Sequence, residues 1–136
     1  KYIGKQRSEI PSVSLNNGLI KINLISGEWD GTKGAFNTLT DILLSTIIFN
    51  GKSQIEIPAP KDHNIFFYVI RGNIKVNETP IEALHLVEFN NDDENIFFEA
   101  EEGSIILFGH AKPFNEPVAA YGPFVMNTED EIKAAY

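Results

Sequence analysis

The three histidines of the chain are the side chains best suited to holding a metal or moving a proton. His63 precedes an apolar segment, His85 alternates with leucine and valine, and His110 follows the end of another apolar segment. Their wide spacing is not that of a metal site. We therefore expect a polar loop residue at His63, with a displaced metal ligand as the alternative. At His85 and His110 we expect histidines that are half-buried on a strand or packed against a neighbouring surface. The three are not expected to form one site.

Other catalytic chemistry finds little support in the sequence. The absence of cysteine excludes disulfides, thiolate zinc sites and thiol nucleophiles. No G-x-S-x-G motif marks a serine nucleophile. Gly31 to Gly34 lacks the pattern of a phosphate-binding loop, and Asp92 to Glu94 lacks the ligand spacing of a calcium loop. We therefore predict no catalytic, cofactor-binding or metal-binding residue in this chain.

Composition and charge exclude further classes of function. Lys and Arg number 11 against 19 Asp and Glu, which gives a net charge of −8 and disfavours binding to nucleic-acid phosphates. No apolar run approaches the length of a membrane span, and no signal peptide is visible. We expect a cytoplasmic protein without nucleic-acid or membrane partners. The chain starts with Lys rather than Met, which is consistent with a fragment or a processed protein.

Short β-like runs separated by turn residues dominate the sequence, and their spacing is typical of an all-β barrel or jelly roll. We expect the runs 65–70 and 74–77 to form a hairpin, residues 90–93 to form a turn, and 117–121 to form a last edge strand. Thr128 and Glu131 have the spacing of a capping box, which predicts a short C-terminal helix. The expected strands span residues 19–25, 42–49, 54–58, 65–70, 74–77, 84–89, 96–99, 104–108 and 117–121.

The apolar side chains around the turn between the expected strand 117–121 and the C-terminal helix are the candidates for an interaction. Gly122-Pro123 fixes a turn that brings Tyr121, Phe124, Val125 and Met126 together. These side chains either dock on a neighbouring surface or cap the core of the same barrel. Docking elsewhere would leave the isolated chain with exposed apolar surface or make it self-associate.

The segment Glu116 to Thr128, EPVAAYGPFVMNT, resembles the C-terminal signature of the pirin family. Other stretches resemble the same family in the same order, and the resemblance extends from about Ile10 to Tyr136. His110 stands where the family usually has glycine, Ala35-Phe36 where it commonly has proline, and Ala120 where arginine is frequent. The other matching stretches are Ile25 to Glu28 with Gly31 and Gly34, Pro58 to Gly72, and Leu107 to Gly109.

The resemblance implies the C-terminal half of a protein with two cupin barrels in tandem. In such proteins the N-terminal barrel holds an iron-type metal on three histidines and a glutamate, and the C-terminal barrel holds none. The cupin ligand positions fall here at Pro58, Pro60 and Ile65, none of which can bind a metal. The implied fold is a cupin-type double-stranded β-helix over residues 16–121. A lead-in segment (1–15) precedes it, and a docking segment with the helix (122–136) follows.

Two functions follow from the resemblance. In the first, the chain is a structural and interaction domain whose partner is the N-terminal cupin of the same protein, a second copy, or another protein. The activity resembling quercetin dioxygenase would then belong to the absent metal cupin, and whether this chain is itself an enzyme stays open. In the second, it is a stand-alone small-molecule-binding cupin or non-haem-metal dioxygenase. Four aromatic residues would then line a pocket rather than fill the barrel, namely Phe66, Tyr68, Phe97 and Phe98.

Overall fold

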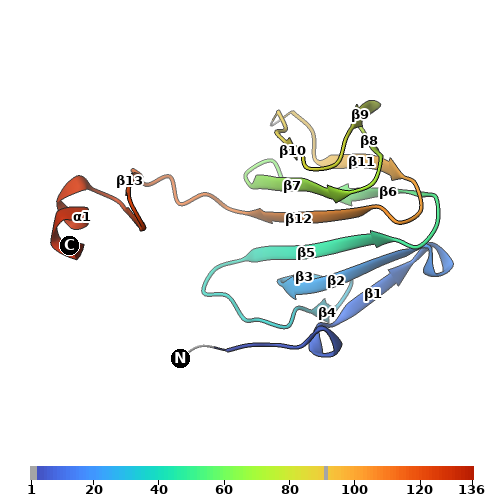
Figure 1. The fold of residues 1–136 in the computed structure, drawn as a ribbon, viewed down its shortest axis with the longest axis horizontal. Coiled ribbons are helices and arrows are strands. Elements are labelled where there is room, and N and C mark those ends of the chain that lie inside the picture. Colours follow the sequence, from blue (N-terminus) through green and yellow to red (C-terminus); the bar gives the residue numbers. More distant parts are fainter. Residues whose placement is uncertain (1–2, 91) are drawn as a thin grey trace.

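The computed structural model describes residues 3–90 and 92–136 and shows two antiparallel sheets that share one core (Figure 1). The larger sheet has the order β1-β2-β5-β12-β7-β10, and the smaller has the order β6-β11-β8-β9. The larger sheet contains β1 (Ser12–Leu15), β2 (Ile20–Ser26), β5 (Ile42–Phe49), β7 (Asn64–Arg71), β10 (Leu86–Val87) and β12 (Ile105–Ala111). The smaller contains β6 (Ser53–Pro58), β8 (Ile74–Val76), β9 (Thr79–Ile81) and β11 (Asn95–Ala100). The predicted all-β jelly roll is confirmed.

Alternation along the strands builds the core, because successive strand residues point to opposite faces of a sheet. Four phenylalanines from both sheets are fully buried: Phe49, Phe67, Phe98 and Phe108. The ring centroids of Phe67 and Phe98 lie 5.2 Å apart in an edge-to-face arrangement, and those of Phe67 and Phe108 lie 6.4 Å apart. Phe67 therefore occupies the centre of an aromatic cluster that joins the two sheets.

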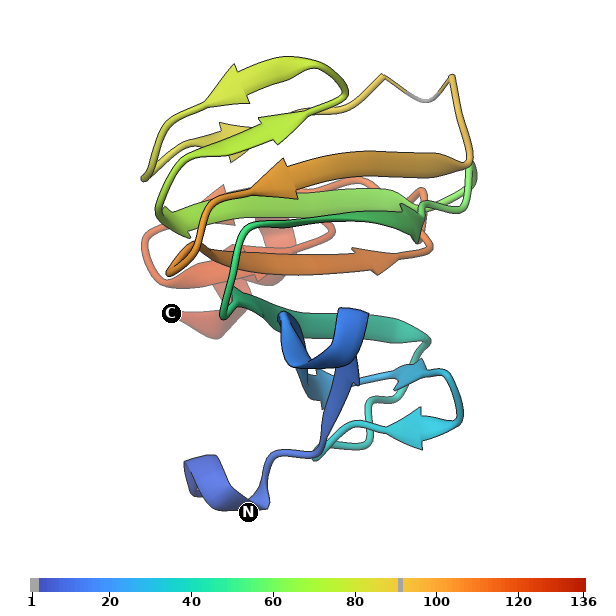
Figure 2. The same ribbon diagram turned by 90° about the vertical axis from the view of Figure 1, so that its right-hand side faces the viewer.

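The predicted hairpin between residues 65–70 and 74–77 is wrong. β7 pairs with β12 and β10, whereas β8 pairs with β11 and β9, so the turn at Gly72 carries the chain from one sheet to the other (Figure 2). Gly72 has a φ of +97°, and a Cβ atom there would overlap the side chain and backbone of Ser104. Glycine is therefore needed at this crossing.

Several strands begin or end at other residues than the sequence predicts. β1 pairs with β2 although it lies within the predicted lead-in segment, and residues 84–89 contain only the two-residue strand β10. A strand does form within the predicted range 117–121, but it does not extend the barrel, because β13 (Ala119–Tyr121) pairs only with β14 (Phe124–Met126). Residues 1, 2 and 91, parts of the predicted lead-in segment and of the predicted 90–93 turn, lie outside the described residues.

Residues 119–136 form a separate unit, here called the arm, that stands apart from the two-sheet sandwich (Figure 1). It consists of the β13–β14 hairpin and helix α1 (Glu129–Ala135). The predicted capping box is confirmed: the backbone N–H of Glu131 donates to Thr128 Oγ1 over 3.2 Å, and Glu131 Oε2 accepts from the Thr128 N–H over 2.9 Å. Within the described part of the chain, no helix combines the length and apolar character needed to cross a membrane.

Candidate functional site

Two of the three histidines, 47 positions apart in sequence, meet at one end of the sandwich. The Nδ1 atoms of His63 and His110 are 2.9 Å apart, and their ring centroids lie 4.9 Å apart. A turn closed by the hydrogen bond from the His63 N–H to the Pro60 carbonyl leads His63 into β7, and His110 lies near the end of β12. β12 and β7 are neighbours, with His110 opposite Ile65. Their spacing in the sequence did not reveal this pair.

The third histidine lies outside any such site. His85 is exposed, and its Nδ1 is 3.1 Å from the Ala83 carbonyl oxygen. It also precedes β10 rather than lying in it, so the expected partly buried strand position is wrong. The positive φ of the preceding Leu84, +66°, interrupts the extended chain there.

Asp62 and Lys112 complete a polar network around the histidine pair. Lys112 Nζ lies 2.9 Å from Asp62 Oδ2, and this hydrogen bond lowers the pKa of Asp62, whose other oxygen is 3.7 Å from His63 Nε2. Burial, and then the charge of His63, lowers the pKa of His110. The ionised Asp62 favours a proton on Nε2 of His63, whose Nδ1 then accepts the Nδ1–H of His110. This arrangement leaves Nε2 of His110 as a hydrogen-bond acceptor.

The histidine pair lines a cavity of about 690 Å³, a volume typical of small-molecule sites. Its apolar wall consists of Trp29, Ile42, Leu43 and Pro58. Three carboxyl side chains, those of Glu28, Asp30 and Asp41, also line it, and no lysine or arginine among the described residues does. The cavity thus combines an aromatic and aliphatic wall with hydrogen-bond acceptors and negative charge.

A tight hairpin places Trp29 and Asp30 at this cavity. β3 (Glu28–Trp29) pairs with β4 (Thr32–Lys33) across a two-residue turn. Asp30 and Gly31 both have positive φ, +46° and +75°, as a type I′ turn requires. Trp29 is partly buried and packs against the core, so its ring has a fixed position on the wall.

A resident metal does not fit the positions where a cupin barrel would hold one. Pro58 lines the cavity, Pro60 precedes the His63 turn, and Ile65 packs against the core; none has a ligand atom in its side chain. Across residues 3–90 and 92–136, no group of three or more His, Asp or Glu side chains is arranged to hold a metal ion.

The four aromatic residues expected to line a pocket or fill the barrel lie on different faces of their sheets. Only Phe98 is buried, whereas Phe66, Tyr68 and Phe97 occupy strand positions that alternate with buried ones. None of the four lines the cavity beside the histidines. The sequence pattern Ile65 to Ile70 is apolar throughout, so it does not show which alternate residues face inwards.

The part of the larger sheet's outer face that β12, β7 and β10 form is apolar as a result, whereas Thr46 and Asn23 continue the same row on β5 and β2. Tyr68 lies opposite Leu107 on one neighbouring strand and opposite Leu86 on the other. Phe66 is 44% exposed and Leu86 is 61% exposed. These four residues, Phe66, Tyr68, Leu86 and Leu107, are here called the outer patch.

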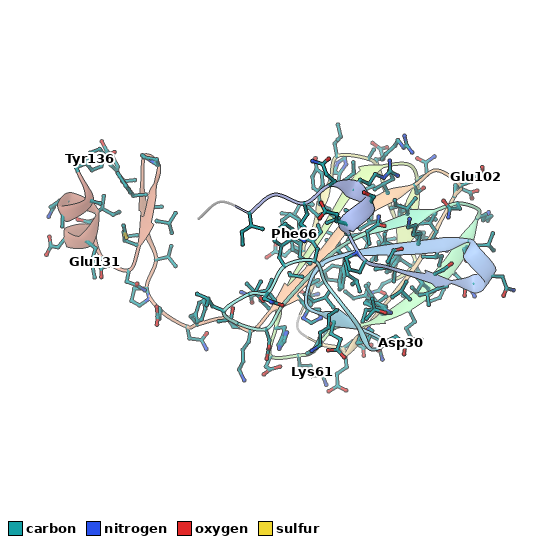
Figure 3. The ribbon with its side chains drawn as sticks, turned by 90° about the horizontal axis from the view of Figure 1, so that it is seen from below. Asp30, Lys61, Phe66, Glu102, Glu131 and Tyr136 are labelled. Carbon is teal, nitrogen blue, oxygen red and sulfur yellow. The ribbon has the colours of Figure 1, made fainter. Side chains whose placement is uncertain are left out.

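The predicted interaction residues lie in the arm and outside the sandwich core: Tyr121 is opposite Phe124, and Val125 and Met126 are opposite Ala120 and Ala119. Tyr121 and Val125 are each 69% exposed. The Phe124 ring packs edge-to-face on that of Tyr136, with ring centroids 5.1 Å apart, and Figure 3 shows Tyr136 away from the sandwich. Met126 and Val125 line a hollow of about 490 Å³ together with residues of the linker that precedes the arm. Asn127 Nδ2 closes this region by donating to Glu116 Oε2 over 2.9 Å.

Comparisons with known proteins agree with this architecture. A crystal structure of a quercetin 2,3-dioxygenase from Acinetobacter baumannii superposes with a TM-score of 0.91 and 28% identity, over 99% of this chain and 47% of that one. A putative quercetin 2,3-dioxygenase from Thermoplasma acidophilum is 26% identical over 99% of this chain and 54% of its own length. Another from Pseudomonas aeruginosa is 35% identical over 98% and 49%.

This chain therefore spans about half the length of the curated relatives it matches. The family profile described as the Pirin C-terminal cupin domain matches residues 46–136, which include the histidine pair, the outer patch and the whole arm. Given this match and the jelly-roll fold, the chain belongs to the pirin family and contains its C-terminal cupin domain.

Proposed function

We propose that this chain is a metal-free structural and interaction domain that completes a two-barrel pirin by docking on a second cupin. The observation that carries the proposal is the arm, which holds apolar side chains away from the core of its own chain. Tyr121 and Val125 are largely exposed, and so is Phe114 in the linker at 72%. Exposed apolar groups gathered in this way mark interaction surfaces.

The outer patch supports the same proposal from the sandwich. Side chains on an exposed sheet face are ordinarily polar, whereas Tyr68, Leu86 and Leu107 are neighbours across three strands of this one. A second barrel seated on this face would bury the patch and contact the arm at the same time. We name the N-terminal cupin of the same protein as this partner, because the relatives are about twice as long as the part matched here.

The proposal assigns the chemistry to that partner. The Acinetobacter baumannii structure is named a quercetin 2,3-dioxygenase and two curated relatives are named putative ones, whereas the cupin ligand positions of this chain hold Pro58, Pro60 and Ile65. An iron-type metal and any oxygenation of a flavonol would then belong to the second cupin. This chain would contribute stability and orientation.

A chimera tests the proposal directly. This chain replaces the matching half of the Acinetobacter baumannii protein, and quercetin turnover, metal content and the thermal transition are measured. We expect one cooperative transition, with metal bound, and turnover that needs both halves. Y121E/V125E should weaken the coupling between the halves, whereas the exposed-site control E102Q should not.

Two results would overturn the proposal. The first is stoichiometric metal and quercetin turnover by this chain alone. The second is a chimera whose halves unfold independently and whose behaviour is the same with and without the arm substitutions.

Binding of a small molecule by this domain itself is the second candidate function. One observation favours it, the cavity beside His63 and His110. It is compatible with docking, because no residue of the arm lines that cavity.

A further inference from the structure

The ligand class of the cavity can be inferred from the groups that line it. We propose that the cavity binds a small organic cation, an ammonium group attached to a flat apolar body. This inference deepens the second candidate function, small-molecule binding, and it is independent of docking by the arm. Three features of the cavity support it: its charge, its hydrogen-bond polarity and its aromatic wall.

Charge is the first feature. Glu28, Asp30 and Asp41 line the cavity, and none of them takes part in an ion pair within the described part of the chain. The lysines adjacent to the histidine pair are engaged by other carboxylates, Lys61 by Glu94 and Lys112 by Asp62. Lys33 lies opposite Glu28 in the β3–β4 pair. With one such lysine against three carboxylates, an anion entering the cavity would meet net negative charge, whereas a cation would be attracted.

Hydrogen-bond polarity is the second feature. In the tautomer that the ionised Asp62 favours, His63 carries its proton on Nε2, the Nδ1–H of His110 donates to Nδ1 of His63, and Nε2 of His110 is an acceptor. Carboxylates are also acceptors at neutral pH. A ligand that donates hydrogen bonds would match these acceptors, and an ammonium group can donate three.

The aromatic wall is the third feature. Trp29 lines the cavity beside Ile42 and Leu43, and an indole face attracts a cation more strongly than other aromatic rings do. The same wall buries a flat apolar body. Aliphatic polyamines, which lack such a body, should therefore bind less well than arylalkylamines.

Trp29 is the only tryptophan of the chain, so its fluorescence reports on this cavity alone. The experiment titrates the intact chain with phenylethylamine, phenylethanol and phenylpropionate, which share a ring and differ in the polar group. Isothermal titration calorimetry repeats each titration independently of the fluorophore. We expect saturable binding of the amine, at least about tenfold weaker binding of the alcohol, and no binding of the carboxylate.

Substitutions in the cavity locate the site. H110F keeps an aromatic ring but removes the acceptor, and we expect binding of phenylethylamine to fall about tenfold. D41N should weaken it by up to about fivefold, as for a partly exposed charge pair. The matched controls are H85A and E102Q; Figure 3 shows Glu102 far from Asp30, and His85 does not line the cavity.

The results distinguish three claims: that the ligand is a cation, that the chain binds a small molecule, and that it binds in this cavity. Equal affinity for the alcohol and the amine would contradict the proposal that the ligand is a cation, but it would support small-molecule binding by the cavity. If neither method detects saturable binding of any probe at millimolar concentration, both the cationic ligand class and small-molecule binding by the cavity are contradicted. Unchanged affinity in H110F and D41N, each with an intact unfolding transition, would overturn the location.

Discussion

The sandwich and the arm contain the same kinds of apolar side chain and bury them to opposite extents. In the sandwich, Phe67, Phe98 and Phe108 are fully buried by residues of the same chain. In the arm, Ile132 is buried, whereas Tyr121 and Val125 are left largely exposed. The sandwich therefore buries a core of its own, and the exposed apolar surface of the arm is what we propose a partner covers. Substitutions that act on one region and spare the other test this division.

The largest effect should come from the centre of the sandwich. F67A removes the ring that contacts Phe98 and Phe108, and we expect a loss of about 3–5 kcal/mol in the free energy of unfolding. Denaturant titration measures it. F66A removes the exposed neighbouring ring and should cost less than about 1 kcal/mol. Similar losses in both variants would contradict the assignment of the core.

A smaller effect is expected at the crossing between the sheets. G72A introduces a methyl group against Ser104 at a φ of +97°, which should cost roughly 1–3 kcal/mol by the same measurement. G103A is the matched control, because its φ is +81° but nothing lies within 4 Å of the added carbon. If G103A costs as much as G72A, the close contact with Ser104 is not the cause.

Within the arm, T128A should destabilise α1 without affecting the sandwich. Loss of the cap costs about 1 kcal/mol of local helix stability. Hydrogen exchange should therefore quicken at Ile132 and its neighbours in α1, while the denaturant midpoint of the sandwich stays unchanged. A shifted midpoint would show that the two regions unfold as one unit, contrary to the division drawn above.

The smallest effect should be the pH dependence of the histidine pair. The pKa of His110 is lowered by burial below its ordinary value of 6.5, so unfolded chains bind more protons in the window between the two values. Stability is then full above pH 6.5 and is lost as the pH falls through the folded value. H110Q should flatten this dependence in denaturant titrations. H85Q should retain the pH dependence of stability. If H85Q and H110Q flatten it equally, the burial of His110 is not its cause.

Local patterns in the sequence predict the elements of this molecule better than their pairing. The run 42–49 and the capping box at Thr128 are visible as sequence patterns, because each depends on neighbours in the chain. The crossing at Gly72 is not visible, since a glycine-asparagine pair suits a hairpin and a change of sheet equally well. Contact with Ser104, a residue distant in sequence, decides between them.

The candidate site shows the same limit. Each histidine has an unremarkable sequence context, and only the pairing of β12 with β7 brings His110 to His63. The uniformly apolar run Ile65 to Ile70 likewise does not reveal which side chains face the core. The arm motif is visible because Tyr121 to Met126 is a continuous segment, but the sequence alone does not decide between docking elsewhere and capping the same barrel.

Hydrogen exchange on the chimera tests the central claim most directly. We expect the amides of residues 119–126, and those of β7 and β10 beneath the outer patch, to exchange more slowly in the two-barrel protein than in this chain alone. Amides around Phe49 and Phe98 in the core should be protected equally in both. Unchanged exchange in the arm and the outer patch, in a chimera that is folded and active, would contradict the claim that this domain acts by docking.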